Sequence, residues 1–336
     1  VAAILVLVAI ARRLLPDSAV RWVPFLAAVH YWALIGVAPT RPDHHGLQLL
    51  LFLVTLLGVM GMVARRGSPS AEWIAGLGTG LAIWVSPEGM ASTGPMIGFL
   101  GVVWLFTGED ELTRRIRRMW WILAGTLAFG VLVDGPQPDR WATEFDRLSL
   151  VHVAAFGMGA LFWSVVRRWP PKGLVVRGAS GVAGAGLAVV LLVLLFPGVQ
   201  GGPLAEMPPE LAGLFLDQVV EFLPAWRFGS TWLLITVGPG FVGIFVAGTL
   251  ALRTTPAPWN SLVGGEGESG RLPRWAWGLI GILLAWFSWF ATFGQVRWTH
   301  YIHVLAPVTS AALLVVGLGW VSRWRGAAAA RQIANI

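Results

Sequence analysis

The stretch RPDHHGLQLLLFLVTLLGVMGMVA at residues 41–64 decides the class of fold. Its 19 residues from Gly46 to Ala64 contain no charged side chain. A helix rises about 1.5 Å per residue, so this run crosses most of a bilayer hydrocarbon core about 30 Å thick. Asp43, His44 and His45 stand directly in front of it. The stretch therefore predicts a membrane helix with ionisable groups at one end.

Similar apolar segments continue along the whole chain. They cover residues 1–11, 22–38, 46–64, 71–87, 93–107, 119–133, 148–166, 178–197, 230–252, 275–294 and 301–322. Of the 336 residues, 56% are hydrophobic and only 12% are charged, half the roughly 25% of an average soluble domain. We therefore predict an all-α, polytopic membrane helix bundle of about 11 transmembrane helices, forming a single transmembrane domain over residues 1–336.

Basic residues are unevenly shared between the predicted loops and set the orientation. Nineteen of the 24 Lys and Arg residues fall in alternate loops and at the C-terminus. Because basic loops stay in the cytoplasm, we expect that set to be cytoplasmic, including the Gly-, Pro- and Ser-rich linker 253–274. The long loop 198–229 and the segments around Asp43, Glu88 and Arg297 then face outward. We expect a multi-pass protein of a bacterial inner membrane, whose net charge of +7 reflects topology and not a nucleic-acid partner.

The chain has no cysteine. This excludes disulfides, thiolate nucleophiles and sulfur-ligated metals, so any metal must be held by oxygen and nitrogen. Asp43 and His45 are such a pair, because Mg²⁺ and Mn²⁺ prefer carboxylate ligands and Mn²⁺ also accepts imidazole. The alternative is that Asp43 caps the helix that begins near His44, while the histidines lie among the lipid headgroups.

Three more ionisable residues of the predicted outer face allow both a structural and a functional interpretation. Arg297 opens the last helix, where its guanidinium either reaches the lipid headgroups or binds a phosphate. Glu221 ends a stretch, 208–221, with the pattern of a short amphipathic helix, and is either a solvated carboxylate or a functional one. Glu88 lies in the Ser-Pro-Glu-Gly run 86–89, which indicates a helix stop and turn, with substrate binding as the alternative.

Together these motifs resemble the catalytic subunit of oligosaccharyltransferase and its bacterial relatives. The motifs are Asp43-His44-His45 before a membrane helix, Val219-Val220-Glu221 in a long outer loop, and Arg297-Trp298-Thr299-His300-Tyr301 opening a late helix. Those proteins belong to the C-type (GT-C) superfamily of membrane glycosyltransferases, which use lipid-phosphate sugar donors.

The resemblance implies a role for each motif. Asp43 and His45 would help to hold a divalent cation, Mg²⁺ or Mn²⁺, and Asp43 and Glu221 would be catalytic. The donor phosphate would be contacted by residues of the late-helix motif, namely Arg297, His300 and Tyr301. Further candidates for the site are His44 and Glu88.

The chain departs from the family in three places. The family's Thr-Ile-x-Glu motif falls on Gln218 to Glu221, which keeps the glutamate but not the threonine. The family's first acidic motif would precede Val1, so we expect the natural chain to extend upstream. The Trp-Trp-Asp-Tyr-Gly acceptor motif has no counterpart, because Trp120-Trp121 is followed by Ile122. The resemblance therefore leaves the acceptor open.

The sequence thus predicts a glycosyltransferase that moves a sugar or oligosaccharide from a polyprenyl-phosphate or -pyrophosphate donor to an acceptor on the outer, periplasmic or extracellular face. The alternative is a non-catalytic integral membrane subunit of a larger complex that keeps the fold. The expected partners are the lipid bilayer, the polyprenyl-linked donor, an unidentified acceptor and, for the alternative, other membrane proteins.

Overall fold

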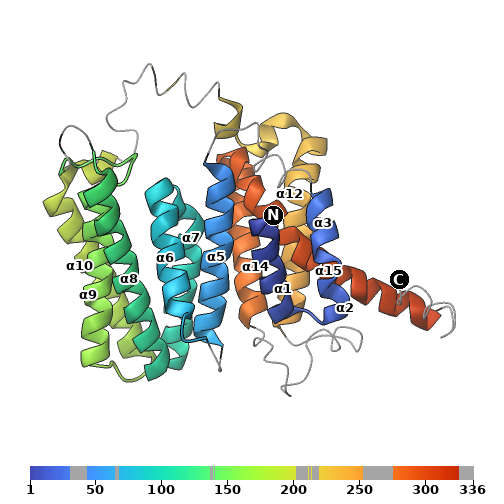
Figure 1. The fold of residues 1–336 in the computed structure, drawn as a ribbon, viewed down its shortest axis with the longest axis horizontal. Helices are drawn as coiled ribbons and strands as arrows, with labels where there is room; N and C mark the ends of the chain where they lie inside the picture. The colour runs from blue at the N-terminus through green and yellow to red at the C-terminus, as the bar shows by residue number, and fades with distance from the viewer. Residues whose placement is uncertain are drawn as a thin grey trace. The chain divides into compact units, whose positions relative to one another are not determined.

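The computed structural model of the protein describes residues 1–30, 44–64, 68–136, 139, 141–201, 211, 213, 219–252 and 275–324. Every regular element in this part of the chain is a helix, which confirms the predicted all-α class. The chain divides into two compact units (Figure 1). Residues 43–213 form the middle unit, and residues 1–42 with 214–336 form the terminal unit. Each unit is described by itself.

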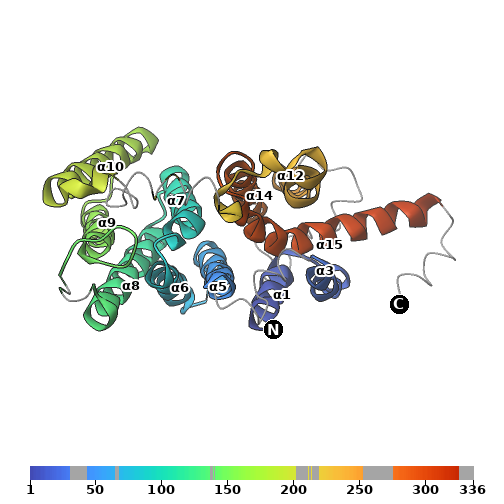
Figure 2. The same cartoon turned by 90° about the horizontal axis from the view of Figure 1, so that it is seen from above.

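The middle unit is a row of packed helices. Its described helices are α5 (His45–Val63), α6 (Ala71–Val85), α7 (Gly89–Thr107), α8 (Asp110–Asp134), α9 (Leu150–Arg168) and α10 (Leu174–Leu195), followed by the 3-10 turn η1 (Pro197–Gly201). Figure 2 shows α6 between α5 and α8, with α9 on the far side of α8 and α10 beside α9. Helix α7 packs against α5 and α6.

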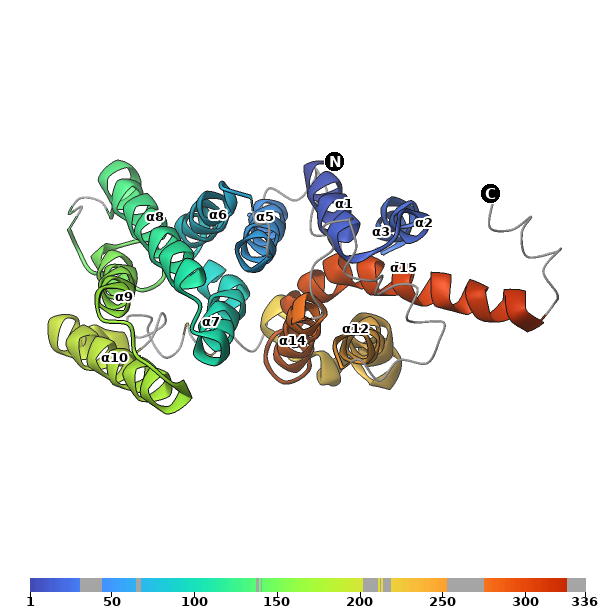
Figure 3. The ribbon, with the colours of Figure 1, turned by 90° about the horizontal axis from the view of Figure 1, so that it is seen from below.

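The terminal unit is built around its last helix. Its described helices are α1 (Ala2–Leu14), α2 (Asp17–Val20), α3 (Val23–Val29), α12 (Ser230–Ala251), α14 (Trp275–Trp289) and α15 (Thr299–Trp324). Four short turns lie between them: η2 (Val220–Phe222), η3 (Ala225–Phe228), η4 (Phe290–Gly294) and η5 (Val296–Trp298). Seen from below, α15 passes between α12 and α14 on one side and α1 and α3 on the other (Figure 3).

Eight helices of the described residues are long and apolar enough to cross a membrane. They are α5, α7, α8, α9, α10, α12, α14 with η4, and η5 with α15. The chain is therefore an integral, multi-pass membrane protein. Helix α6 is apolar but has only 15 residues, and α1 and α3 are described over 13 and 7 residues. For this reason the count of about 11 spans stays a prediction.

Helix α8 begins earlier than its apolar segment. The predicted segment started at residue 119, whereas the helix starts at Asp110. The charged turns are helical because Glu111 pairs with Arg114 and Arg115, three and four residues on along one face. Hydropathy marks only the apolar part of a helix, whereas the helix itself extends as far as its backbone hydrogen bonds continue.

Close packing of the helices depends on glycine. A Cβ atom at Gly58 of α5 would lie 2.8 Å from Cα of Ala75 in α6. A Cβ atom at Gly240 of α12 would collide with Oγ of Ser288 in α14. Lipid chains are as apolar as the helices, so association in a membrane depends on such close backbone approach more than on the hydrophobic effect.

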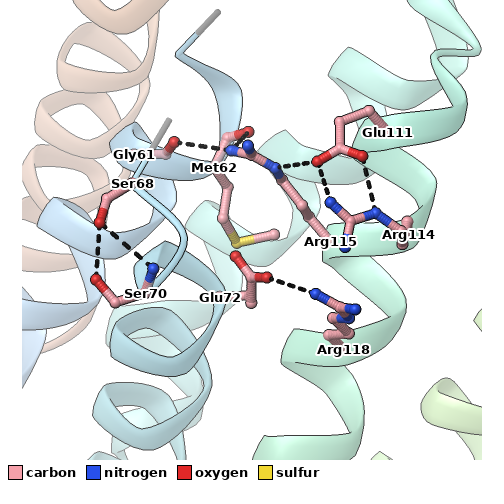
Figure 4. Close-up of polar contacts among 9 residues, drawn as sticks. All are labelled: Gly61, Met62, Ser68, Ser70, Glu72, Glu111, Arg114, Arg115 and Arg118. Atoms are coloured by element: carbon pink, nitrogen blue, oxygen red, sulfur yellow. Dashed lines mark hydrogen bonds and ion pairs between the residues drawn. The ribbon is translucent and has the colours of Figure 1, made fainter. Parts of the chain in front are cut away.

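Arginines brace one end of the middle unit (Figure 4). Arg115 donates hydrogen bonds to the carbonyl oxygens of Gly61 and Met62 in the last turn of α5, at 3.3 and 3.2 Å, and to Glu111 at 2.8 Å. A cation is favourable there because the last carbonyls of a helix have no partner within the helix. On α6, Glu72 is 3% exposed and lies 3.4 Å from Arg118. These contacts join α5, α6 and α8.

Basic residues gather at this same end of the middle unit. The described ones are Arg114, Arg115, Arg117, Arg118, Arg167, Arg168, Lys172 and Arg177, all near the start of α8 or α10 or the end of α9. Glu88 and Asp134 lie at the opposite end, where α6 and α8 finish. Most described basic residues of this unit therefore lie at one end, where Glu72, Glu109, Asp110 and Glu111 also lie. The predicted orientation in the membrane stays a prediction.

Candidate functional site

Two segments far apart in the sequence meet in the terminal unit. The backbone N–H of Val296 in η5 donates to the carbonyl oxygen of Leu223, just after η2, at 2.8 Å. The guanidinium carbon of Arg297 lies 4.4 Å from the centroid of the Phe222 ring, a cation–π distance. Glu221 precedes Phe222 in η2. The structure thus brings together the segments that carry two of the predicted site residues, Glu221 and Arg297.

A π turn positions Arg297. Helix α14 ends in η4, where the N–H of Gln295 bonds the carbonyl of Phe290 at 2.8 Å, five residues back. Gln295 is extended, with φ −132° and ψ 128°, and its Oε1 accepts a hydrogen bond from Arg297 Nε at 2.8 Å. Single π turns in long helices often occur at functional sites. Here the turn redirects the chain so that η5 lies against η2.

An aromatic stack supports the same segment from inside the unit. The rings of Phe287 and Tyr301 are nearly parallel, with centroids 4.6 Å apart, and Trp298 stacks on Tyr301 at 5.7 Å. Tyr301 is only 8% exposed. Its ring is therefore part of the packing that fixes η5, and the phosphate contact of Tyr301 stays a prediction.

Two buried histidines lie in the first two turns of α15. His300 is 8% exposed and His303 is 3% exposed. Nδ1 of His303 lies 3.1 Å from Nδ1 of His30 at the end of α3, and its Nε2 lies 3.0 Å from the carbonyl oxygen of Thr236 in α12. The sequence reading singled out His300 but missed His30 and His303. Their position could have indicated a site, because both histidines lie within predicted apolar segments. Ionisable residues are rare there unless they have a partner.

The other predicted residues begin α5 and α7 in the middle unit. The residue before the first turn of α5 is His44, and its side chain forms no capping hydrogen bond. The rings of His44 and His45 lie 4.9 Å apart. One turn on, Gln48 is 2% exposed, and its Nε2 donates to the carbonyl oxygen of Ala82 in α6 at 2.8 Å. This bond joins the start of α5 to the last turn of α6, just before the turn that carries Glu88.

Asp43 itself lies outside the described residues. Among those described, no three histidine, aspartate or glutamate side chains come close enough together to hold a metal ion. Only His45 of the expected ligand pair is described, so the divalent cation stays a prediction. The same holds for the amphipathic helix at 208–221 and the linker 253–274, most or all of which lie outside the described residues.

The predicted site residues therefore divide between the two units. The middle unit holds His44, His45 and Glu88, and the terminal unit holds Glu221, Arg297, His300 and Tyr301. Comparisons of the chain with protein-family models, with curated proteins and with solved structures found no match.

Proposed function

We propose that the chain is a C-type membrane glycosyltransferase of a bacterial inner membrane, with its site on the outer face and its C-terminus in the cytoplasm. It would transfer a sugar or oligosaccharide from a polyprenyl-phosphate or -pyrophosphate donor to an acceptor. The observation that carries the proposal is the contact of η2 with η5, which sets Arg297 against Phe222, the residue after Glu221. A donor site of this kind needs a group that binds the phosphate and a carboxylate. Here Arg297, just before α15, would be the first, and Glu221 in η2 would be the second.

In the proposed reaction the acceptor attacks the anomeric carbon while the bond from that carbon to the donor phosphate breaks. Negative charge grows on the departing phosphate, and Arg297 would stabilise it with charge-assisted hydrogen bonds. Gln295 and Phe222 hold the guanidinium in place before the donor binds, which reduces the entropy lost on binding. Glu221 would orient the acceptor and accept the proton that the acceptor loses on attack. A divalent cation held by Asp43 and His45 would act as a Lewis acid at the phosphate.

Arg297 gives the direct test, and Arg227 is its control. Both are arginines next to an aromatic ring in the terminal unit, since the Arg227 guanidinium lies 5.9 Å from Trp226 in η3. Arg297→Gln is expected to lower donor cleavage by about 100-fold or more, the usual effect of removing one donor to a developing anion. Arg227→Gln is expected to leave it unchanged.

The measurement is release of the polyprenyl carrier from a labelled lipid-linked donor. It uses the full chain in proteoliposomes, with a bacterial membrane extract as the source of acceptor and with Mg²⁺ or Mn²⁺ present. Equal activity of the wild type and Arg297→Gln would rule out the mechanism.

The non-catalytic subunit remains a second candidate because of one observation. Arg297 already has Gln295 and Phe222 as partners, and an arginine with a purely structural role would have the same contacts. This candidate predicts that the purified chain neither binds nor cleaves the donor, with or without a divalent cation. It also predicts that Arg297→Gln lowers the melting temperature of the chain. Saturable donor binding to the wild type would exclude it.

A further inference from the structure

His30 and His303 form an imidazole pair inside the terminal unit. Their Nδ1 atoms are 3.1 Å apart, and their rings meet edge to face with centroids 5.4 Å apart. His303 is 3% exposed, and its Nε2 lies 3.0 Å from the carbonyl oxygen of Thr236. The three residues lie on α3, α15 and α12. Neither His30 nor His303 belongs to the proposed donor site.

The hydrogen-bond partners decide which nitrogen carries each proton. A carbonyl oxygen only accepts, so Nε2 of His303 must carry a proton and donate it to Thr236. In neutral His303 the other nitrogen, Nδ1, is then an acceptor. His30 must therefore carry its proton on Nδ1 and donate it to His303. This leaves Nε2 of His30 as the free basic nitrogen of the pair.

One further proton fits this arrangement without breaking a hydrogen bond. If it binds Nε2 of His30, the bond from Nδ1 of His30 to His303 persists. If the proton on Nδ1 of His30 then moves across the 3.1 Å contact, His303 becomes the charged ring and still donates to Thr236. A second proton would place an N–H on both facing nitrogens, and these two donors cannot remain in contact.

We infer that His30 and His303 are a proton-binding site within the helix bundle, which holds one proton shared between two imidazoles. The inference goes beyond the transferase proposal and does not depend on it. Intramembrane ionisable side chains that pair with each other are typical of proton sites.

Two described carboxylates belong to the terminal unit, Asp17 in α2 and Glu221 in η2. Helices α12 and α14 carry no titratable side chain over Ser230–Ala251 and Trp275–Trp289. The other titratable residues on the described elements of this unit, besides the pair itself, are Arg12, Arg13, Arg21, Arg227, Arg297, His300, Tyr301 and Arg323. Two positive charges on the pair would repel each other across the 3.1 Å contact.

The test is ¹⁵N nuclear magnetic resonance of the full chain in lipid nanodiscs, with labelled histidine and a chelator in the buffer. The chain has six histidines, so single substitutions suffice to assign each ring. His152 in the middle unit, whose Nδ1 accepts a hydrogen bond from the backbone N–H of Ser149 at 3.2 Å, serves as the internal reference. At neutral pH we expect His303 to be protonated at Nε2 and His30 at Nδ1. On acidification both rings should shift together in one step, with a second step more than about one pH unit lower.

His30→Gln is expected to abolish the joint step and to leave the signals of His152 unchanged. The wild-type spectrum is decisive even if this variant folds poorly. Three results would overturn the inference: His30 protonated at Nε2 in the neutral protein, independent titration of His30 and His303, or a change in their signals when the chelator is replaced by Zn²⁺. The last result would identify a metal-binding pair.

Discussion

Glu144 and Arg147 lie in the connection between α8 and α9, outside the membrane-spanning helices. Arg147 Nη2 donates to Glu144 Oε1 at 2.7 Å, and this hydrogen bond lowers the pKa of Glu144. A carboxylate whose pKa is lower in the folded state stabilises the protein above its unfolded pKa, about 4.3, and loses that contribution as pH falls through the folded pKa. The pair should therefore matter at neutral pH and not in acid.

The substitution Arg147→Gln tests whether the pair stabilises the protein at neutral pH and not in acid. The variant is expected to melt at a lower temperature than the wild type at pH 7. The difference should shrink as pH falls below the unfolded pKa of Glu144, about 4.3, and should vanish only below its lowered folded pKa, where the carboxyl group is protonated in both proteins. Thermal unfolding in detergent between pH 7 and 3 measures it. A difference that stays constant over this range would show that Arg147 acts through packing and not through the carboxylate.

Single residues of the candidate site were only partly predictable. The position of Arg297 at a helix start follows from the apolar run after it, but its partners Gln295 and Phe222 depend on a π turn that no local pattern indicates. His30 and His303 are separated by 273 residues and have no joint motif. Their contact becomes visible only when α3 is packed on α15.

At the scale of elements, the length of each apolar segment correctly predicted the presence of a helix. Each predicted segment overlaps a described helix, because a membrane span must satisfy its backbone hydrogen bonds within itself. Boundaries were less predictable where charged turns extend a helix, as in α8. Which helices pack together could not be predicted, since it depends on the fit of individual side chains, such as Gly58 against Ala75.

Gly58→Ala is expected to separate α5 from α6. The added Cβ would lie 2.8 Å from Cα of Ala75, and backbone atoms cannot move aside as a flexible side chain would. Overpacking of this kind costs about 1–3 kcal/mol. Gly125→Ala in α8 is the matched control, because a Cβ there meets no atom within 4 Å. Thermal unfolding of both variants compares them, and equal melting temperatures would contradict the packing that we describe.

At the scale of the whole molecule, the transferase proposal makes a demand that the sequence could only suggest. His45 belongs to the middle unit, and Glu221 and Arg297 belong to the terminal unit. One donor must reach all three if the mechanism is right. Sequence order carries no information on such convergence.

Cysteine cross-linking tests this demand, and the chain supplies a cysteine-free background. Leu47→Cys, next to His45, and Trp226→Cys in η3 replace two exposed side chains, one in each unit. A short bifunctional maleimide is expected to join them, with a higher yield when the donor is present. Lys172→Cys paired with Trp226→Cys is the control, since Lys172 lies at the opposite end of the middle unit, about 30 Å away across the bilayer core. Equal cross-linking yields for the two cysteine pairs would contradict the proposal that one donor reaches His45, Glu221 and Arg297.

Helix α10 has no buried residue along its 22 positions. At about 1.5 Å per residue it is roughly 33 Å long, close to the thickness of a typical hydrocarbon core. A helix that is longer than the local hydrocarbon core is thick responds by tilting. Since no side chain of α10 is buried by its neighbours, lipids with shorter tails are expected to tilt it more than the closely packed helix α5.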